Sequence, residues 1–227
     1  MEDKIKEIGK KDRINYELFI QMEQDKRLSE LSKIPKTKLE SKHINNLKFI
    51  LDRQELLSRM QKSGVCAEIG VANGDFSKDI FNTTNPQKLH LIDSWDSERY
   101  GKELMNNVKS TFNTQIESGY VEVNRGFSTV VLQSFQDEYF DWVYIDTDHS
   151  YNTTNQELLI CKDKVKDNGV IAGHDFHIGN WVTGYKYGVI EAVYEFCVLY
   201  NWEIIYLTSD IEYASFAIKR IPADLLK

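Results

Sequence analysis

Residues 67–76, AEIGVANGDF, join a short apolar run to glycines, an arrangement typical of a strand that turns into a helix. Gly70 and Gly74 carry no side chain, so backbone N–H groups and a helix N-terminus can approach a ligand. The dinucleotide pattern GxGxxG does not fit, because Ala72 and Asp75 occupy its second and third glycine positions. The lysine of a P-loop is also missing. The stretch predicts a loop for a nucleotide-like cofactor, with the expected binding residues Glu68, Gly70, Val71, Ala72, Asn73 and Gly74.

Polar residues also follow the next two apolar runs. Asp93, in KLHLIDSW, lies 23 positions after Gly70, near the roughly 20-residue offset at which an acid accepts hydrogen bonds from ribose hydroxyls. We expect Asp93 and the adjacent Ser94 to face the cofactor, the alternative being a solvent-exposed turn. Further on, Phe127 and Ser128 can flank the base of such a cofactor, although Ser128 is equally a helix N-cap.

Two further predicted strand ends carry acids and imidazoles. In open α/β sheets, ligands bind beyond the carboxyl ends of the strands, so we expect these groups in one cleft. Crowded carboxylates raise one another's pKa values and destabilise the fold unless a cation or a proton is shared. Asp146 and Asp175, with His174 or a water, would give the oxygen-rich shell that Mg²⁺ or Mn²⁺ accepts. The motifs WVYIDTDHSY and VIAGHDFH supply Asp146, Asp148, His149, His174, Asp175 and His177.

The histidines of this group have different expected roles. Acidic neighbours would keep the His149 imidazole basic and oriented, which suits a general base, with Asp148 as the second candidate. His174 is a metal-ligand candidate, and its alternative is a structural hydrogen bond at the strand end. We expect His177 to lie in a loop.

The elements that must position these residues follow an alternating pattern. From residue 65 onward, short apolar stretches alternate with helical ones, which predicts a doubly wound parallel α/β sheet. Residues 1–33 predict a helix, and residues 44–60 predict one broken or two short helices, with Asp52 and Glu55 as a cap. Strands are expected at 65–71, 88–93, 119–125, 139–146, 168–174, 202–208 and 212–220. Further helices are expected at 76–83, 101–116, 128–135, 152–166 and 185–200.

Composition narrows the class of protein. A chain of 227 residues with 41% hydrophobic content suits one domain with an extension, which we place at residues 43–227 and 1–42. Residues 1–48 carry 12 Lys or Arg against 9 Asp or Glu, and the remainder carries 16 against 26. This acidic body argues against a nucleic-acid partner. The three cysteines lack the spacing of a metal site, and the sequence has neither a long apolar run nor a signal-peptide pattern. We therefore expect a cytoplasmic protein with no membrane partner.

The order of these motifs resembles that of the class I S-adenosylmethionine-dependent methyltransferases. EIGVANGDFS, LIDSW, IDTDHSY and GHDF are most similar to the metal-dependent sugar O-methyltransferases, which act on deoxysugars of macrolide and aminocoumarin antibiotics. The resemblance covers about residues 45–220. It implies a Rossmann-like, seven-stranded sheet of order 3-2-1-4-5-7-6 with the last strand antiparallel.

The resemblance also implies roles for individual residues. The cofactor S-adenosylmethionine would contact the glycine loop, with Asp93 at the ribose, Ser128 at the adenine and Asp146 nearby. Asp146 and Asp175 would match metal ligands. The family has an acid directly before the second ligand, where this chain has His174, so the identity and the presence of the metal are open. His149 and Asp148 occupy positions where different relatives carry the general base.

The expected activity is therefore methyl transfer from S-adenosylmethionine to a hydroxyl of a small acceptor, a sugar in the first place and a catechol as an alternative. The loop of residues 178–187, with Trp181 and Tyr185, is the candidate for gripping the acceptor. Two other functions stay open, a metal-dependent hydrolase that uses the Asp/His cluster and a non-catalytic, cofactor-binding regulatory protein. The N-terminal helices either cover the cleft or pair subunits of a homo-oligomer.

Overall fold

The computed structural model describes residues 2–180, 182–210 and 213–226. Residues 1–36 and 37–227 form two compact units, whereas the sequence placed a domain boundary at residues 42–43. The first unit contains helix α1 (Glu2–Ser32), which confirms the helix expected over residues 1–33. Along this helix, Arg13 and Glu17 form an ion pair one turn apart, with a distance of 2.9 Å.

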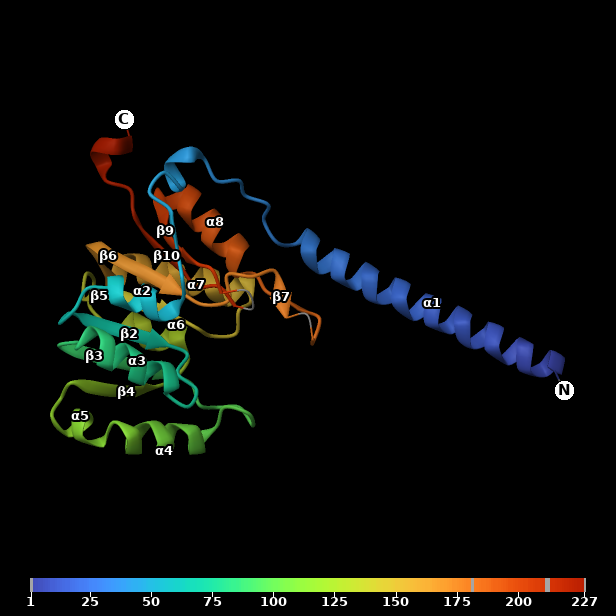
Figure 1. Cartoon of the computed structure of the whole chain (residues 1–227), viewed down its shortest axis with the longest axis horizontal. Helices are drawn as coiled ribbons and strands as arrows, with labels where there is room; N and C mark the ends of the chain where they lie inside the picture. The colour runs from blue at the N-terminus through green and yellow to red at the C-terminus, as the bar shows by residue number, and fades with distance from the viewer. Residues whose placement is uncertain (1, 181, 211–212, 227) are drawn as a thin grey trace. The chain divides into compact units, whose positions relative to one another are not determined.

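The second unit is built on an eight-stranded sheet of order β1-β9-β10-β6-β5-β2-β3-β4 (Figure 1). Strand β10 is antiparallel to both of its neighbours, and the other strand pairs are parallel. The prediction of seven strands was wrong by one, because β1 pairs with β9 as an additional edge strand. The other seven strands have the predicted order. The bounds are β1 (Lys48–Ile50), β2 (Val65–Ile69), β3 (Lys88–Asp93), β4 (Val121–Arg125), β5 (Phe140–Ile145), β6 (Val165–Gly173), β9 (Trp202–Thr208) and β10 (Phe216–Arg220).

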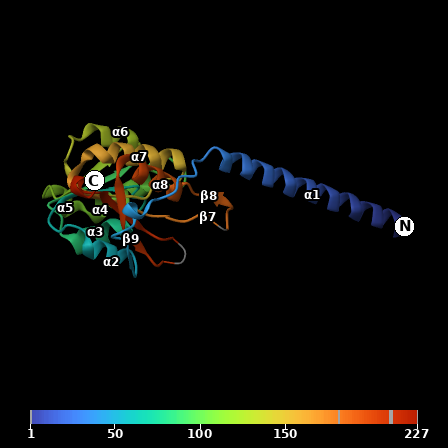
Figure 2. The same ribbon diagram turned by 90° about the horizontal axis from the view of Figure 1, so that it is seen from above.

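Helices cover both faces of this sheet, α2, α3 and α4 on one face and α6, α7 and α8 on the other (Figure 2). Side chains alternate between the two cores along each central strand, as Trp142 and Val143 of β5 do. The bounds are α2 (Arg53–Arg59), α3 (Asp75–Thr84), α4 (Lys102–Thr111), α5 (Asn113–Glu117), α6 (Ser128–Val131), α7 (Tyr151–Lys164) and α8 (Val189–Tyr200), with 3₁₀ turns at Ser41–His43, Leu132–Ser134 and Ala223–Leu226.

Residues 44–60 differ from the prediction. The apolar spacing predicts one broken or two short helices, but residues 48–50 form β1, which pairs in parallel with β9. Ile50 is buried there while its neighbour Phe49 is exposed, the alternation of a strand with one covered face. The predicted cap is confirmed at the start of α2, where Asp52 accepts a hydrogen bond from the Glu55 N–H at 2.8 Å. The Glu55 carboxylate in turn accepts one from the Leu51 N–H.

Smaller differences concern the segment before α8 and the last strand. The helix predicted over 185–200 begins at Val189, because residues 185–186 pair as β8 (Tyr185–Lys186) with β7 (Gly179–Asn180) in a small hairpin. The last strand was expected over residues 212–220, and β10 begins at Phe216. Glu212, at the expected start of that strand, lies outside the described residues, as does Trp181 of the expected acceptor loop. All three cysteines are buried free thiols, and none of the described helices is long and apolar enough to cross a membrane.

Candidate functional site

The residues that follow three central strands stay in register with the sheet. The Gly70 N–H donates to the Ile92 carbonyl at 2.8 Å, and the Asp146 N–H donates to the Ile69 carbonyl at 2.7 Å. The His174 N–H donates to the Ile145 carbonyl at 2.9 Å. These bonds hold Gly70, Asp146 and His174 side by side at the carboxyl edge of the sheet. A Cβ at Gly70 would lie 1.9 Å from the Asp146 carbonyl oxygen, so this approach requires glycine.

A cavity of about 870 Å³ opens at this edge, a size suited to a small-molecule ligand. The glycine loop, the ends of β3 and β4 and the segment after β5 all line it. Gly74 is the one predicted cofactor residue that does not, and Asp148 and His149 also reach the cavity. The predicted residues that line it are Glu68, Gly70, Val71, Ala72, Asn73, Asp93, Ser94, Phe127, Ser128, Asp146, Asp148 and His149.

Asp93 organises the glycine loop as well as facing the cavity. One carboxylate oxygen accepts hydrogen bonds from the N–H groups of Val71 and Ala72, each at 2.9 Å, and the other accepts from the Trp95 N–H at 2.9 Å. The Trp95 indole donates to the Ala72 carbonyl at 2.9 Å. Because a carboxylate offers about four acceptor sites, Asp93 can still accept one further hydrogen bond from a ligand.

Two ionisable groups, Glu68 and Arg53, also line the cavity. Glu68 is buried, and burial raises the pKa of its carboxyl well above the usual range, while the Ser77 hydroxyl donates to it. Arg53, the first residue of α2, has a guanidinium nitrogen 3.7 Å from an Asp146 oxygen and lies over the Phe76 ring at 4.0 Å. Arg53 is not signalled by the sequence pattern, because it precedes the alternating strands and helices. The Asp52 cap predicts the start of its helix but not that the Arg53 side chain reaches the cavity.

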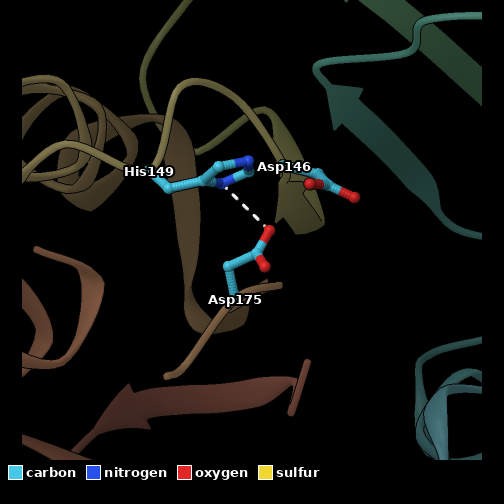
Figure 3. Close-up of side chains that lie close together, drawn as sticks. All are labelled: Asp146, His149 and Asp175. Carbon is cyan, nitrogen blue, oxygen red and sulfur yellow. Dashed lines mark ion pairs between the residues drawn. The ribbon is translucent and has the colours of Figure 1, made fainter. Parts of the chain in front are cut away.

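The predicted acid and imidazole groups come together beyond β5 and β6 (Figure 3). Asp146, His149 and Asp175 place their ligand atoms within 4.8 Å of one another. The Nδ1 atom of His149 lies 3.0 Å from an Asp175 oxygen. His174 is adjacent, its Nδ1 3.2 Å from Asp175 and 3.7 Å from Asp146. The structure thus groups two of the three predicted metal-ligand candidates, Asp146 and Asp175, with His149, which is expected from the sequence as a base, while the third candidate, His174, lies beside this group.

The pair of His149 and Asp175 is held in a strained backbone geometry. Both residues have positive φ angles, 61° and 54°, a left-handed conformation that costs about 1–3 kcal/mol for a residue with a side chain. The Gly188 N–H donates to the His149 carbonyl, and the His149 ring packs 4.9 Å from the ring of Tyr187. Such strain concentrates at functional sites.

The charge of this cluster is only partly compensated. Burial raises the pKa of Asp146, and the neighbouring His174 opposes that shift. Asp175 is 4% exposed, and its described ion-pair partners are the two imidazoles. One imidazole and two carboxylates form a donor set that a divalent cation accepts. These residues therefore fit the metal, and binding it would require the His149 nitrogen facing Asp175 to lose its proton.

Other predicted residues serve local structure. The Asp148 carboxylate accepts hydrogen bonds from the Ser150 N–H and the Thr153 hydroxyl at the start of α7. His177 bonds to Gly179 in the β7–β8 hairpin, consistent with a loop position. The expected acceptor loop forms this hairpin, and none of its described residues lines the cavity. Tyr187 contacts the site through the ring of His149.

The strand order and the placement of the cavity define an α/β Rossmann-like methyltransferase fold. Residues 67–176, which contain the glycine loop, Asp93 and the Asp146–Asp175 cluster, match the family described as a methyltransferase domain. No curated protein matches the sequence of this chain. The matched residues make up just under half of the chain.

Solved structures agree on the fold. The chain is similar to the pyocyanin biosynthetic protein PhzM, with 11% identity and a TM-score of 0.57 over 74% of this chain and 54% of that chain. It thus spans about half the length of PhzM. A candidate rRNA methylase from Clostridium thermocellum gives 12% identity and a TM-score of 0.57, covering 74% and 93% of the two chains. A candidate methyltransferase from Streptococcus mutans, in complex with SAH, has 10% identity to this chain and a TM-score of 0.54. The likeness covers 74% of this chain and 95% of that chain.

Proposed function

We propose that this protein transfers a methyl group from S-adenosylmethionine to a hydroxyl of a small acceptor, with a sugar as the first candidate. The observation that carries the proposal is a single cavity lined by the glycine loop and Asp93 together with Asp146 and His149. A cofactor-binding loop and groups able to bind or remove a proton therefore face the same space.

In this proposal, the cofactor lies along the carboxyl edge of the sheet. Its ribose would use the remaining acceptor site of Asp93, and its adenine would lie against Phe127, whose side chain is 63% exposed. The methionine end would lie at Gly70 and Asp146. The Arg53 guanidinium, which lines the cavity beside Asp146, offers a partner for the methionine carboxylate.

The reaction needs an aligned acceptor and a base, because the sulfonium methyl is already activated. The acceptor oxygen would attack in line with the S–CH₃ bond, and its proton would pass to the enzyme. With the Nδ1–H of His149 directed at Asp175, the Nε2 atom is left as a neutral base. Positioning by Asp175 would fix this tautomer.

A divalent cation, Mg²⁺ or Mn²⁺, would be held by Asp146, His149 and Asp175, and when bound it would lower the pKa of acceptor hydroxyls. His149 cannot be ligand and base at once. If His149 ligates, Asp148 is the remaining candidate base, since it also lines the cavity. The effect of a chelator on turnover separates these two assignments.

Calorimetric titration with S-adenosylmethionine and S-adenosylhomocysteine, with Mg²⁺ and with chelator, tests the proposal. Asp93→Ala should weaken cofactor binding at least about tenfold, because it removes the ribose acceptor, two hydrogen bonds to the glycine loop and one to the Trp95 N–H. His149→Ala should reduce turnover at least about a hundredfold with a smaller effect on cofactor binding. Asp137→Ala, at an exposed aspartate paired with Lys164, is the control. Unchanged binding in Asp93→Ala together with unchanged turnover in His149→Ala would refute the assignment.

The remaining expectations belong to the same proposal. The acceptor is a small molecule rather than a nucleic acid, because the body of the chain is acidic. Three buried free thiols suit the reducing cytoplasm. The Asp146, His149 and Asp175 cluster favours a metal-dependent hydrolase as the second candidate, which would bind a catalytic metal and have no affinity for S-adenosylmethionine.

A further inference from the structure

A buried glutamate connects two walls of the cavity without lining it. Glu157, in α7, is fully buried, and the Ser128 hydroxyl donates to one of its carboxylate oxygens at 2.5 Å. The Thr147 hydroxyl donates to the other at 2.9 Å. Ser128 starts α6 and Thr147 follows Asp146, and both line the cavity. Among the described residues, no Lys, Arg or His forms an ion pair with Glu157.

The two hydrogen bonds restrict what these hydroxyls can do in the cavity. An ionised carboxylate only accepts hydrogen bonds, so each hydroxyl must give its single proton to Glu157. What remains on Ser128 and Thr147 is lone pairs, which accept hydrogen bonds and cannot donate them. The wall of the cavity beside Phe127 therefore suits a ligand edge that donates.

We propose that Glu157 is a positioning residue that makes Ser128 an acceptor, so that the cavity selects a base with an exocyclic amino group over one with a carbonyl at that place. This inference rests on the proposed function, in which the cavity holds an adenosyl cofactor. A carbonyl would face the lone pairs of Ser128 without a proton between them. A site built for a hydrogen-bond donor rejects a ligand that lacks it, because the buried acceptor is left unpaired.

The test compares S-adenosylhomocysteine with S-inosylhomocysteine, in which a carbonyl replaces the amino group of the adenine. Calorimetric titrations are run at pH 8, where Glu157 is ionised, since burial raises its pKa to about 7. The wild type should bind the adenosyl compound at least about tenfold more tightly. Glu157→Leu frees the Ser128 proton to turn toward the ligand and should reduce this ratio to about threefold or less.

Two further variants complete the design. Ser128→Ala removes the acceptor itself and should reduce the ratio in the same way, and it decides the question if Glu157→Leu does not fold. Glu195→Leu is the matched control, a glutamate in α8 that accepts a hydrogen bond from Tyr151 and does not line the cavity. It should keep the wild-type ratio.

The outcomes separate the two proposals. A wild type that binds S-adenosylhomocysteine without preferring it over the inosyl compound would overturn this inference alone. An unchanged preference for the adenosyl compound in Glu157→Leu would also overturn it. If Glu157→Leu does not fold, an unchanged preference in Ser128→Ala would do so. A wild type that binds neither compound would overturn the proposed function and this inference with it.

Discussion

Ala72, which occupies the second glycine position of the dinucleotide pattern GxGxxG, adopts a left-handed backbone conformation with a φ of 48°. Two hydrogen bonds hold this conformation: the Ala72 N–H donates to the Asp93 carboxylate, and the Trp95 indole donates to the Ala72 carbonyl. A side chain in this region costs about 1–2 kcal/mol relative to a right-handed conformation. The departure from the glycine pattern therefore changes the stability of the loop rather than its path.

Replacing Ala72 by glycine should increase the free energy of unfolding. Removing the Cβ relieves the strain, and the greater backbone entropy of glycine offsets part of the gain, leaving about 0.5–1 kcal/mol. Urea denaturation measures this change. Ala192→Gly, at the fourth residue of α8, is the control and should destabilise the protein, because glycine disfavours a helix. Destabilisation by Ala72→Gly as well would contradict the account of the loop.

Glu157 should make stability depend on pH in a defined direction. Its carboxyl pKa is raised from 4.5 to about 7 by burial, while the Ser128 and Thr147 hydroxyls oppose the shift and the charge of Asp148 adds to it. The folded state then binds more protons than the unfolded state between these values. This contribution to stability is therefore full below pH 4.5 and is lost as the pH rises to about 7.

The free energy of unfolding, measured in urea at pH 5 and pH 8, tests this direction. Between these values the wild type should lose more stability than Glu157→Leu, by an amount on the order of 3 kcal/mol at most. The comparison removes the effect of groups that titrate in both proteins. Equal losses in the two proteins would show that the carboxyl does not titrate in this window.

At the scale of elements, the strands that surround the site follow from local pattern. Strands β3 and β9 have the predicted bounds, because each is a dense apolar run with turn residues on both sides. Strand β1 could not be predicted in this way. Its partner is far away in sequence, with Lys48 opposite Tyr206, and the spacing of residues 44–60 also fits a helix. The pairing with β9, which is distant in sequence, favours the strand over the helix at residues 48–50.

Two neighbouring positions in β1 test that assignment. Ile50 is 5% exposed and packs in the core under α2, whereas Phe49 is 73% exposed. Ile50→Ala should cost about 2 kcal/mol or more, and Phe49→Ala should cost less than about 0.5 kcal/mol. Chemical denaturation of both variants gives the comparison. Similar losses at the two positions would contradict a strand with a single buried face.

At the scale of the whole molecule, the sheet explains why the candidate site could largely be predicted. Parallel strands end at one edge, so polar residues after successive apolar runs gather there, as Asp93 and Asp146 do. Two features of the site could not be predicted from the sequence. Arg53 reaches the cavity from α2, outside the alternating pattern, and the pairing of His149 with Asp175 depends on left-handed backbone conformations that no motif signals.

The central claim is that one cavity at this edge binds S-adenosylmethionine. A crystal structure of the protein with S-adenosylhomocysteine and Mn²⁺ tests it most directly. The account predicts the ribose at Asp93, the base beside Phe127 and Ser128, and the homocysteine end at Gly70 and Asp146, with space left toward His149. A ligand bound elsewhere, or an empty cavity at saturating concentration, would contradict it.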